Sequence, residues 1–235
     1  MKAIILAAGQ GTRLYPLTLD VPKTLLKVGD LSIIERLVNH FKKIDVSEII
    51  LVVGYKKEHL IEKYQYDPKI KFYEYSKFKE TNNLFTLWSI RKQLNEIDED
   101  IIISFADIVL EYQIIENLIK SKNDFVMAIH SESILEGTMR VCVKDKKIKS
   151  ITETKVEDAT GNFIGIAKFS KKGSKILFEH LSKLIDDDHL DAYYTIAINN
   201  YIKNDGFVEA LDVKSLKWIE IDDNADYKRA IKMYM

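Results

Sequence analysis

The sequence has little of the residue types that several common chemistries require. Its 235 residues include one cysteine, Cys142, and five histidines. A single cysteine excludes an internal disulfide and a metal site built from cysteines, and the histidines lack the spacing of a metal ligand set. No Ser-His-Asp or Cys-His pattern is present either. Cys142 lies in an alternating run, which favours a half-buried strand thiol over a nucleophile.

Neither sign of charge is in excess, and long hydrophobic runs are missing. The chain has 35 Lys and Arg against 36 Asp and Glu, a net charge of −1. This balance does not favour nucleic acid or an acidic membrane as a partner, so any basic patch must be local. No apolar stretch approaches the roughly 20 residues of a membrane span. We therefore expect a cytoplasmic protein that binds neither nucleic acid nor membrane.

The apolar residues predict an α/β fold. The chain is 46% hydrophobic and long enough for one α/β domain. Strands are predicted at residues 2–6, 49–53, 70–75, 100–105 and 125–129. Helices are predicted after a capping box from Ser32 to Glu35, and at 58–64, 84–94 and 114–119. Apolar strands separated by helices indicate a mostly parallel sheet flanked by helices.

The pattern changes after residue 130. Alternating runs at 139–144 and 147–151 flank Asp145-Lys146 and predict a hairpin. The remaining predicted elements are a strand at 163–169, helices at 177–185 and 196–202, a strand at 218–221, and a helix at 226–233 capped by Asn224. We interpret the chain as a single domain, 1–235, with a first part at 1–130, a small β-rich part at 131–217 and a returning strand and helix at 218–235.

The most informative stretch is residues 6–26, L-A-A-G-Q-G-T-R-L-Y-P-L-T-L-D-V-P-K-T-L-L. A strand that ends in a glycine-containing loop can bring backbone N–H groups up to a phosphate, and Arg13 and Lys23 add positive charge there. The pattern predicts a nucleoside triphosphate site. It is not a P-loop, because no Gly-Lys-Ser/Thr occurs, and a dinucleotide fingerprint would need glycine in place of Leu14.

The whole stretch resembles the signature L-A-A-G-x-G-[ST]-R-L-x-P-L-T…P-K-x-L of nucleotidyltransferases that couple NTPs to sugar phosphates and small phosphates. The resemblance implies a Rossmann-like nucleotide-diphospho-sugar transferase fold, with nucleotide binding in residues 1–130 and the acceptor in 131–217. It implies that Arg13 neutralises the β- and γ-phosphates, and that Lys23 bridges the α-phosphate and the incoming phosphate. The nucleotide-binding residues that it implies are Leu6, Ala7, Ala8, Gly9, Gly11, Thr12, Asn82, Asn83 and Ala106.

Asn82 and Asn83 have two interpretations. They can cap the following helix, or they can contact the base or ribose. The stretch N-N-L-F-T-L-W resembles N-N-x-x-S-L of phosphocholine and aminoalkylphosphonate cytidylyltransferases. This segment alone favours CTP over other nucleotides.

Two aspartates are candidate Mg²⁺ ligands. Asp107 follows a predicted buried strand, at the edge of the sheet where ligands bind in open α/β folds. The resemblance gives it the position of the first Mg²⁺ ligand. In K-W-I-E-I-D-D-N-A-D-Y, the resemblance places the second ligand at Asp222, whereas Asp223 could instead support the cap of the final helix.

The acceptor side carries weaker signals. The run G-x-F-I-G-x-x-K-F-S at 161–170 resembles the acceptor-side segment of cytidylyltransferases of phosphonate and phosphoramidate pathways. It implies close substrate approach at Gly165 and a phosphate contact from Lys168, the alternative being an exposed strand lysine. The resemblance to phosphocholine cytidylyltransferases implies that Asp191, Tyr193 and Tyr194 enclose an ammonium group, the tyrosines by cation–π contact. The alternative is that the tyrosines belong to the core.

These features together predict a Mg²⁺-dependent cytidylyltransferase. It would join CMP from CTP to phosphocholine, 2-aminoethylphosphonate, a phosphoglutamine-like molecule or another small zwitterion, releasing pyrophosphate. The product would be used to decorate a surface or capsule polysaccharide. The sequence does not decide between a monomer and a homodimer. Residues 130–200 contain no tryptophan, so a choline-type aromatic box would rest on tyrosines alone. The alternatives are a sugar-1-phosphate uridylyl-, thymidylyl- or guanylyltransferase and a catalytically silent nucleotide-binding regulatory subunit.

Overall fold

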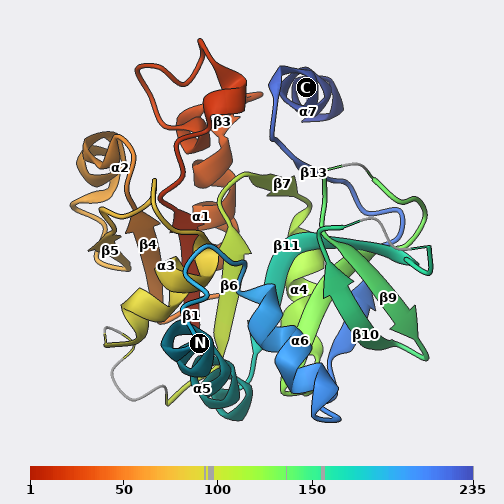
Figure 1. Ribbon diagram of the computed structural model, residues 1–235. Helices are drawn as coiled ribbons and strands as arrows, with labels where there is room; N and C mark the ends of the chain where they lie inside the picture. Colours follow the sequence, from red (N-terminus) through yellow and green to blue (C-terminus); the bar gives the residue numbers. More distant parts are fainter. Residues whose placement is uncertain (93, 95–97, 136, 155–156, 235) are drawn as a thin grey trace.

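The computed structural model describes residues 1–92, 94, 98–135, 137–154 and 157–234 (Figure 1). Its main sheet in these residues has nine strands in the order β5-β4-β1-β6-β11-β8-β12-β10-β9. The bounds are β1 Lys2–Ala7, β4 Glu48–Val53, β5 Ile70–Glu74, β6 Ile101–Phe105, β8 Phe125–His130, β9 Arg140–Lys144, β10 Lys147–Thr152, β11 Gly161–Phe169 and β12 Glu209–Asp212. Strands β5, β4, β1 and β6 pair in parallel, as do β8 and β12. Strand β11 is antiparallel to both of its long neighbours, β6 and β8. The predicted mostly parallel α/β sheet is therefore confirmed. Strand β11 in the middle of the sheet and β10 next to its far edge run opposite to the other strands.

Helices cover both faces of this sheet. The helices α1 (Ile33–Lys43), α2 (Lys57–Tyr64) and α4 (Tyr112–Lys120) lie on one face, and α3 (Asn83–Ser89), α5 (Lys171–Asp186) and α6 (Thr195–Lys203) on the other. The alternation of a strand explains how one apolar run serves both layers. In β1, Ile4 packs in the cluster of α3, α5 and α6, whereas Ile5 packs in the cluster of α1, α2 and α4. Both side chains are completely buried.

Short elements close the sheet at one end. A two-stranded sheet joins β7 (Ile108–Leu110) to β13 (Trp218–Glu220), and another joins β2 (Lys27–Val28) to β3 (Leu31–Ser32). The 3₁₀ helices are η1 (Thr12–Leu14), η2 (Lys23–Leu25) and η3 (Ile90–Lys92), and the last helix is α7 (Asn224–Tyr234). Leu14, Val109, Ile219 and Ala230 share one buried cluster, so residues from both ends of the chain meet beyond β6. Figure 1 shows α7 and the C-terminus near β3.

Several local predictions are confirmed. Residues Asp145 and Lys146 form the two-residue turn between β9 and β10, with φ of 51° and 60°. Two left-handed residues are what a type I′ hairpin turn needs. Helix α5 is also confirmed, but it starts earlier than predicted because the Ser170 side chain accepts a hydrogen bond from Gly173 N at 3.0 Å.

In the described residues there is no helix both long and apolar enough to cross a membrane.

Two helix ends differ from the prediction. Helix α3 ends at Ser89 and continues as η3, whereas the sequence predicts a helix through Leu94. Residues 93 and 95–97 of that prediction lie outside the described residues. The start of α7 is capped by Asp223, whose Oδ1 accepts from Ala225 N at 2.8 Å and from Asp226 N at 2.9 Å. Asn224, the predicted cap, lies inside the helix and its Nδ2 donates to Tyr15 O.

The capping box of α1 leads to a testable prediction. Glu35 accepts from Ser32 N at 2.7 Å and forms an ion pair with Lys63 at 2.6 Å. Burial alone would raise the pKa of Glu35, but the hydrogen bonds from Lys63 and Ser32 outweigh it and hold the pKa at about 2. We expect Glu35→Ala to lower the free energy of unfolding at pH 7 by about 1 kcal/mol, measured by urea denaturation.

The pH dependence of that loss follows from the direction of the pKa shift. Because the folded-state pKa lies below the ordinary value of 4.5, the carboxylate stabilises the fold above pH 4.5. That contribution is lost as the pH falls from 4.5 towards 2, so the gap between wild type and variant should close there. Glu62→Ala, at an exposed position of α2, serves as the control. A gap that stays constant with pH would contradict the ionic role of Glu35.

Candidate active site

A pocket of about 450 Å³ opens beside the carboxyl ends of β1 and β6. Its lining includes nine residues that the sequence predicts: Leu6, Ala8, Gly9, Arg13, Asn82, Asn83, Asp107, Tyr193 and Asp222. The carboxyl edge of parallel strands is where open α/β sheets bind ligands. The signature stretch and the segments of Asp107 and Asp222 thus reach one place, although they are far apart in the chain.

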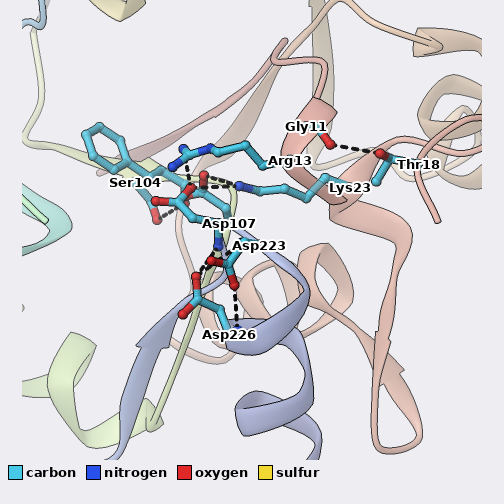
Figure 2. A network of polar contacts seen from close by, with 10 residues as sticks. Gly11, Arg13, Thr18, Lys23, Ser104, Asp107, Asp223 and Asp226 are labelled. Atoms are coloured by element: carbon cyan, nitrogen blue, oxygen red, sulfur yellow. Dashed lines mark hydrogen bonds and ion pairs between the residues drawn. The ribbon is translucent and has the colours of Figure 1, made fainter. Parts of the chain in front are cut away.

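The glycine loop after β1 is shaped by close contacts. Gly11 has φ of 63°, and a Cβ there would lie 2.9 Å from the Cβ of Lys23. A side chain at this position would therefore be strained in its backbone and would collide with Lys23. A Cβ at Gly9 would meet nothing within 4 Å, in keeping with its place on the pocket wall. Thr18 Oγ1 donates to Gly11 O at 2.8 Å, and this hydrogen bond across the loop stabilises its conformation (Figure 2).

Two cationic side chains and two carboxylates meet beside this loop. Lys23 Nζ lies 2.8 Å from Asp107 Oδ2 and 3.3 Å from Asp222 Oδ1. Arg13 Nη2 lies 2.9 Å from the same oxygen of Asp222. Figure 2 shows Arg13 and Lys23 both pointing toward Asp107. Burial would lower the pKa of Lys23, but Asp107 and Asp222 raise it above its ordinary value, so Lys23 carries its charge at neutral pH.

Glu220 adds a third carboxylate, which is not among the residues predicted from the sequence. One oxygen each from Asp107, Glu220 and Asp222 lies within 4.8 Å of the others. Strand β13 pairs with β7, and Ile221 N donates to Asp107 O at 2.9 Å, which aligns the two acidic segments. Burial, then Asp107 and Asp222, raise the pKa of Glu220 well above its ordinary value.

The residues present fit a divalent cation. Asp107 Oδ1 is buried and has no hydrogen-bond partner among the described residues. Such an atom is costly unless a ligand completes it. Carboxylate oxygens are the ligands that Mg²⁺ and similar hard cations prefer. Asp107, Glu220 and Asp222 are therefore the candidate ligands in the described part of the chain.

Asp222 and Asp223 have different surroundings. Asp222 faces Lys23 and Arg13, whereas Asp223 caps α7. Asp226 Oδ2 accepts from the backbone N of both residues, at 3.0 and 3.1 Å, and orients the turn between them. Figure 2 shows Asp223 and Asp226 together at the start of that helix. The hydrogen bonds that Asp223 accepts from backbone N–H groups, that of Asp226 first, lower its pKa.

Asn82 and Asn83 line the pocket and also hold its walls. Asn82 Oδ1 accepts from Asn83 N at 2.8 Å, so its capping role is confirmed. Asn83 Oδ1 accepts from Tyr194 N at 2.8 Å, which ties α3 to the segment before α6. Contact of either side chain with a base or ribose stays a prediction.

The structure corrects two acceptor-side predictions, those for Lys168 and Gly165. Lys168 is only 3% exposed, donates to Ser121 O at 2.7 Å and lies 3.5 Å from Asp100. It is neither an exposed lysine nor a pocket residue. Gly165 is buried with φ of 85°, and a Cβ there would lie 2.9 Å from the ring of Phe105. It therefore serves packing rather than substrate approach.

Of the tyrosine pair, only Tyr193 lines the pocket. Tyr194 is completely buried, with its ring 6.1 Å from that of Phe105, so it belongs to the core. Burial raises the pKa of Tyr193, which keeps its phenol neutral.

The other predicted residues lie around the pocket rather than on its lining. Ala7 and Ala106 are buried in the core cluster of α1, α2 and α4. Thr12 and Asp191 are exposed. The pocket residues that the sequence analysis misses are Phe78, Thr81, Thr86, Phe105, Gly137, Thr138, Met139, Glu153, Phe163 and Glu220. One of them had a signal, because Glu220 stands two residues before Asp222 on a predicted strand and shares its side. The others come from five separate segments without a common motif.

Comparison with known proteins agrees with this geometry. The family model for nucleotidyl transferases matches residues 2–129, more than half of the chain. The chain is 33% identical over 208 residues to the bifunctional protein GlmU of Methanococcus aeolicus, covering 86% of this chain and 47% of that protein. It thus spans about half the length of its GlmU relatives.

Two other relatives match over nearly their whole length. The choline-phosphate cytidylyltransferase of Streptococcus pneumoniae is 29% identical, with 97% of this chain and 96% of that protein covered. A solved structure of CTP:phosphocholine cytidylyltransferase from that organism superposes with a TM-score of 0.77 at 22% identity, covering 100% and 99% of the two chains. The CTP:phosphoglutamine cytidylyltransferase of Campylobacter jejuni is 28% identical, with 99% and 100% covered.

Proposed function

The chain belongs to the nucleotidyl transferase family, and from this premise we propose that it is a divalent-metal-dependent cytidylyltransferase. It would transfer CMP from CTP to a small phosphate or phosphonate and release pyrophosphate. The observation that carries the proposal is the meeting of Arg13 and Lys23 with Asp107, Glu220 and Asp222 at the glycine loop. A group of cations and metal-binding carboxylates beside a phosphate-binding loop suits transfer between two anions.

CTP is the nucleotide that two observations favour. The N-N-L-F-T-L segment lies on the pocket wall through Asn82 and Asn83. Two relatives that match this chain over nearly their whole length are named as cytidylyltransferases. The signature stretch is shared with sugar-1-phosphate nucleotidyltransferases, so these are the second candidate and the assay below separates the two.

The acceptor that we propose is a zwitterion. Glu153, Glu220 and Tyr193 share the pocket, and Arg13 is the one basic residue among the described residues of its lining. Burial and then Asp191 raise the pKa of Glu153, so a cation placed beside these carboxylates would be favoured. An acceptor with its own ammonium group could place this group near Glu153 and its phosphate near Lys23.

The reaction needs charge stabilisation more than proton transfer. An oxygen of the acceptor phosphate would form a bond to the α-phosphorus of CTP as the bond to the pyrophosphate oxygen breaks. Two like unit charges 4 Å apart repel by about 4 kcal/mol at an effective dielectric of ~20, and several such pairs are present. Arg13 and Lys23 would offset this repulsion, and a divalent cation on Asp107, Glu220 and Asp222 would supply further positive charge. No general base is needed because the nucleophile is already ionised.

The test is pyrophosphate release with each of the four NTPs crossed against phosphocholine, 2-aminoethylphosphonate, phosphoglutamine and glucose-1-phosphate. Turnover with CTP and one zwitterion, abolished by EDTA and restored by Mg²⁺, is the expected result. Turnover restricted to another NTP and glucose-1-phosphate would favour the second candidate. NTP binding without turnover for any acceptor would favour a catalytically silent nucleotide-binding subunit.

Glu153→Gln tests the zwitterion. We expect about a tenfold drop in kcat/KM for 2-aminoethylphosphonate, because a charge pair near 4 Å is worth between about 1 kcal/mol in water and about 4 kcal/mol at a dielectric of ~20. Ethylphosphonate, which lacks the ammonium group, should lose much less. Glu157→Gln, at an exposed position in the same segment, is the control. Equal losses for both phosphonates would place the ammonium group elsewhere.

A further inference from the structure

One wall of the pocket is a connecting segment without regular structure. Residues 131–139 join β8 to β9 and contribute Gly137, Thr138 and Met139 to the pocket. Within its described residues, 131–135 and 137–139, the segment has no helix or strand. It lies with β9, β10 and β11 on the side of the sheet away from β5 and α2 (Figure 1). Something other than a sheet ladder must hold its backbone in place.

The side chain of Asn162 in β11 holds this segment through hydrogen bonds. Its Nδ2 donates to His130 O at 3.3 Å and to Ser133 O at 2.6 Å. Its Oδ1 accepts from Leu135 N at 2.9 Å and from Thr138 Oγ1 at 3.0 Å. These four hydrogen bonds use both donors and both acceptor positions of the amide. All four lead to one end of β8 and to the segment that follows it.

The choice of asparagine here is unfavourable for the strand alone. Asparagine is depleted in strands, and a buried amide costs free energy unless its hydrogen bonds are made. Asn162 is nevertheless completely buried. Its neighbours bind the same region closely: a Cβ on Gly161 would lie 2.7 Å from His130 O, and Phe163 N donates to Met139 O at 2.8 Å. Phe163 itself lines the pocket.

We propose that Asn162 is a positioning residue that sets acceptor binding by holding Gly137, Thr138 and Met139 against the pocket. The inference rests on the proposed function, since it assigns this wall to the acceptor together with Glu153 and Tyr193. Asn162 itself is absent from the pocket lining in the described residues, so it acts through the segment that it binds. The nucleotide side of the pocket is built from the glycine loop and α3, which Asn162 does not contact through these bonds.

The experiment measures both Michaelis constants of Asn162→Ala with CTP and the acceptor found for wild type. We expect the acceptor KM to rise about tenfold, because small displacements of a substrate-positioning wall are costly. The CTP KM and kcat should stay within about twofold of wild type. Asn162→Ser keeps one hydroxyl for these partners, so its acceptor KM should lie between those of wild type and Asn162→Ala. It replaces the alanine variant in the experiment if that variant is too unstable.

Ser170→Ala is the matched control at the other end of β11. It removes the hydrogen bond to Gly173 N, so it should lower the thermal midpoint without changing either KM. An unchanged acceptor KM in Asn162→Ala, with a lowered midpoint, would reduce Asn162 to a structural residue and overturn the inference. Equal rises in both KM values would overturn it as well. No turnover by wild type with any pair would instead contradict the proposed function, and the acceptor role of Asn162 with it.

Discussion

Asp107→Ala and Lys23→Ala are each expected to reduce turnover at least about a hundredfold, the loss typical of removing one preorganised charge from a transition state. Lys23 lies 2.8 Å from Asp107 and carries its charge at neutral pH. Removing Lys23 leaves the converging anions without their central cation. Removing Asp107 takes away a candidate metal ligand and leaves Lys23 paired with Asp222 alone. The measurement is single-turnover pyrophosphate release with saturating CTP, acceptor and Mg²⁺.

The controls for this pair come from the neighbouring hairpin of β2 and β3. Lys27→Ala and Asp30→Ala change exposed residues of the same charges and should leave turnover within about twofold of wild type. Circular dichroism and the thermal midpoint should show that all four variants fold. If Asp107→Ala reduced turnover by less than about tenfold, Asp107 would not be a metal ligand, since a ligand to the ion cannot be dispensable.

Local signals explain which parts of the fold the sequence could predict. The Ser32–Glu35 capping box, the Asp145-Lys146 turn and the apolar run of β1 each depend on residues close in the chain. The signature stretch works in the same way, because a Cβ at Gly11 would lie only 2.9 Å from the Cβ of Lys23, so the glycine leaves room for the lysine twelve positions on. In motifs of this kind, residues close in the chain determine the local geometry, so the sequence alone predicts it.

The direction of β11 explains why Lys168 lies away from the pocket. In a parallel sheet the carboxyl end of every strand reaches the ligand edge, but β11 runs antiparallel to β6. Its amino end, with Asn162 and Phe163, therefore lies near the pocket, and Lys168 pairs with Ile102 at the opposite edge. The alternation of a strand tells which residues share a face, but strand direction depends on distant partners. No residue within 161–169 encodes that direction.

The second large effect is expected at Asp222, against its neighbour Asp223. Asp222→Ala should reduce turnover at least about a hundredfold, because this carboxylate contacts both Lys23 and Arg13 and completes the candidate metal cluster. Asp223→Ala should keep turnover within about threefold of wild type and lower the thermal midpoint, because it removes the cap of α7. Asp223→Asn keeps a capping oxygen and should restore the midpoint.

Neighbouring aspartates can separate in this way because successive side chains leave an extended backbone on opposite sides. Ile221 N bonded to Asp107 O sets the register, so Asp222 turns to the pocket and Asp223 to the helix. If Asp223→Ala lost activity and Asp222→Ala kept it, that register would have to differ during the reaction. Mn²⁺ binding to each variant, measured by electron paramagnetic resonance, distinguishes these cases without relying on turnover. Weak binding in Asp222→Ala alone is what the observed register requires.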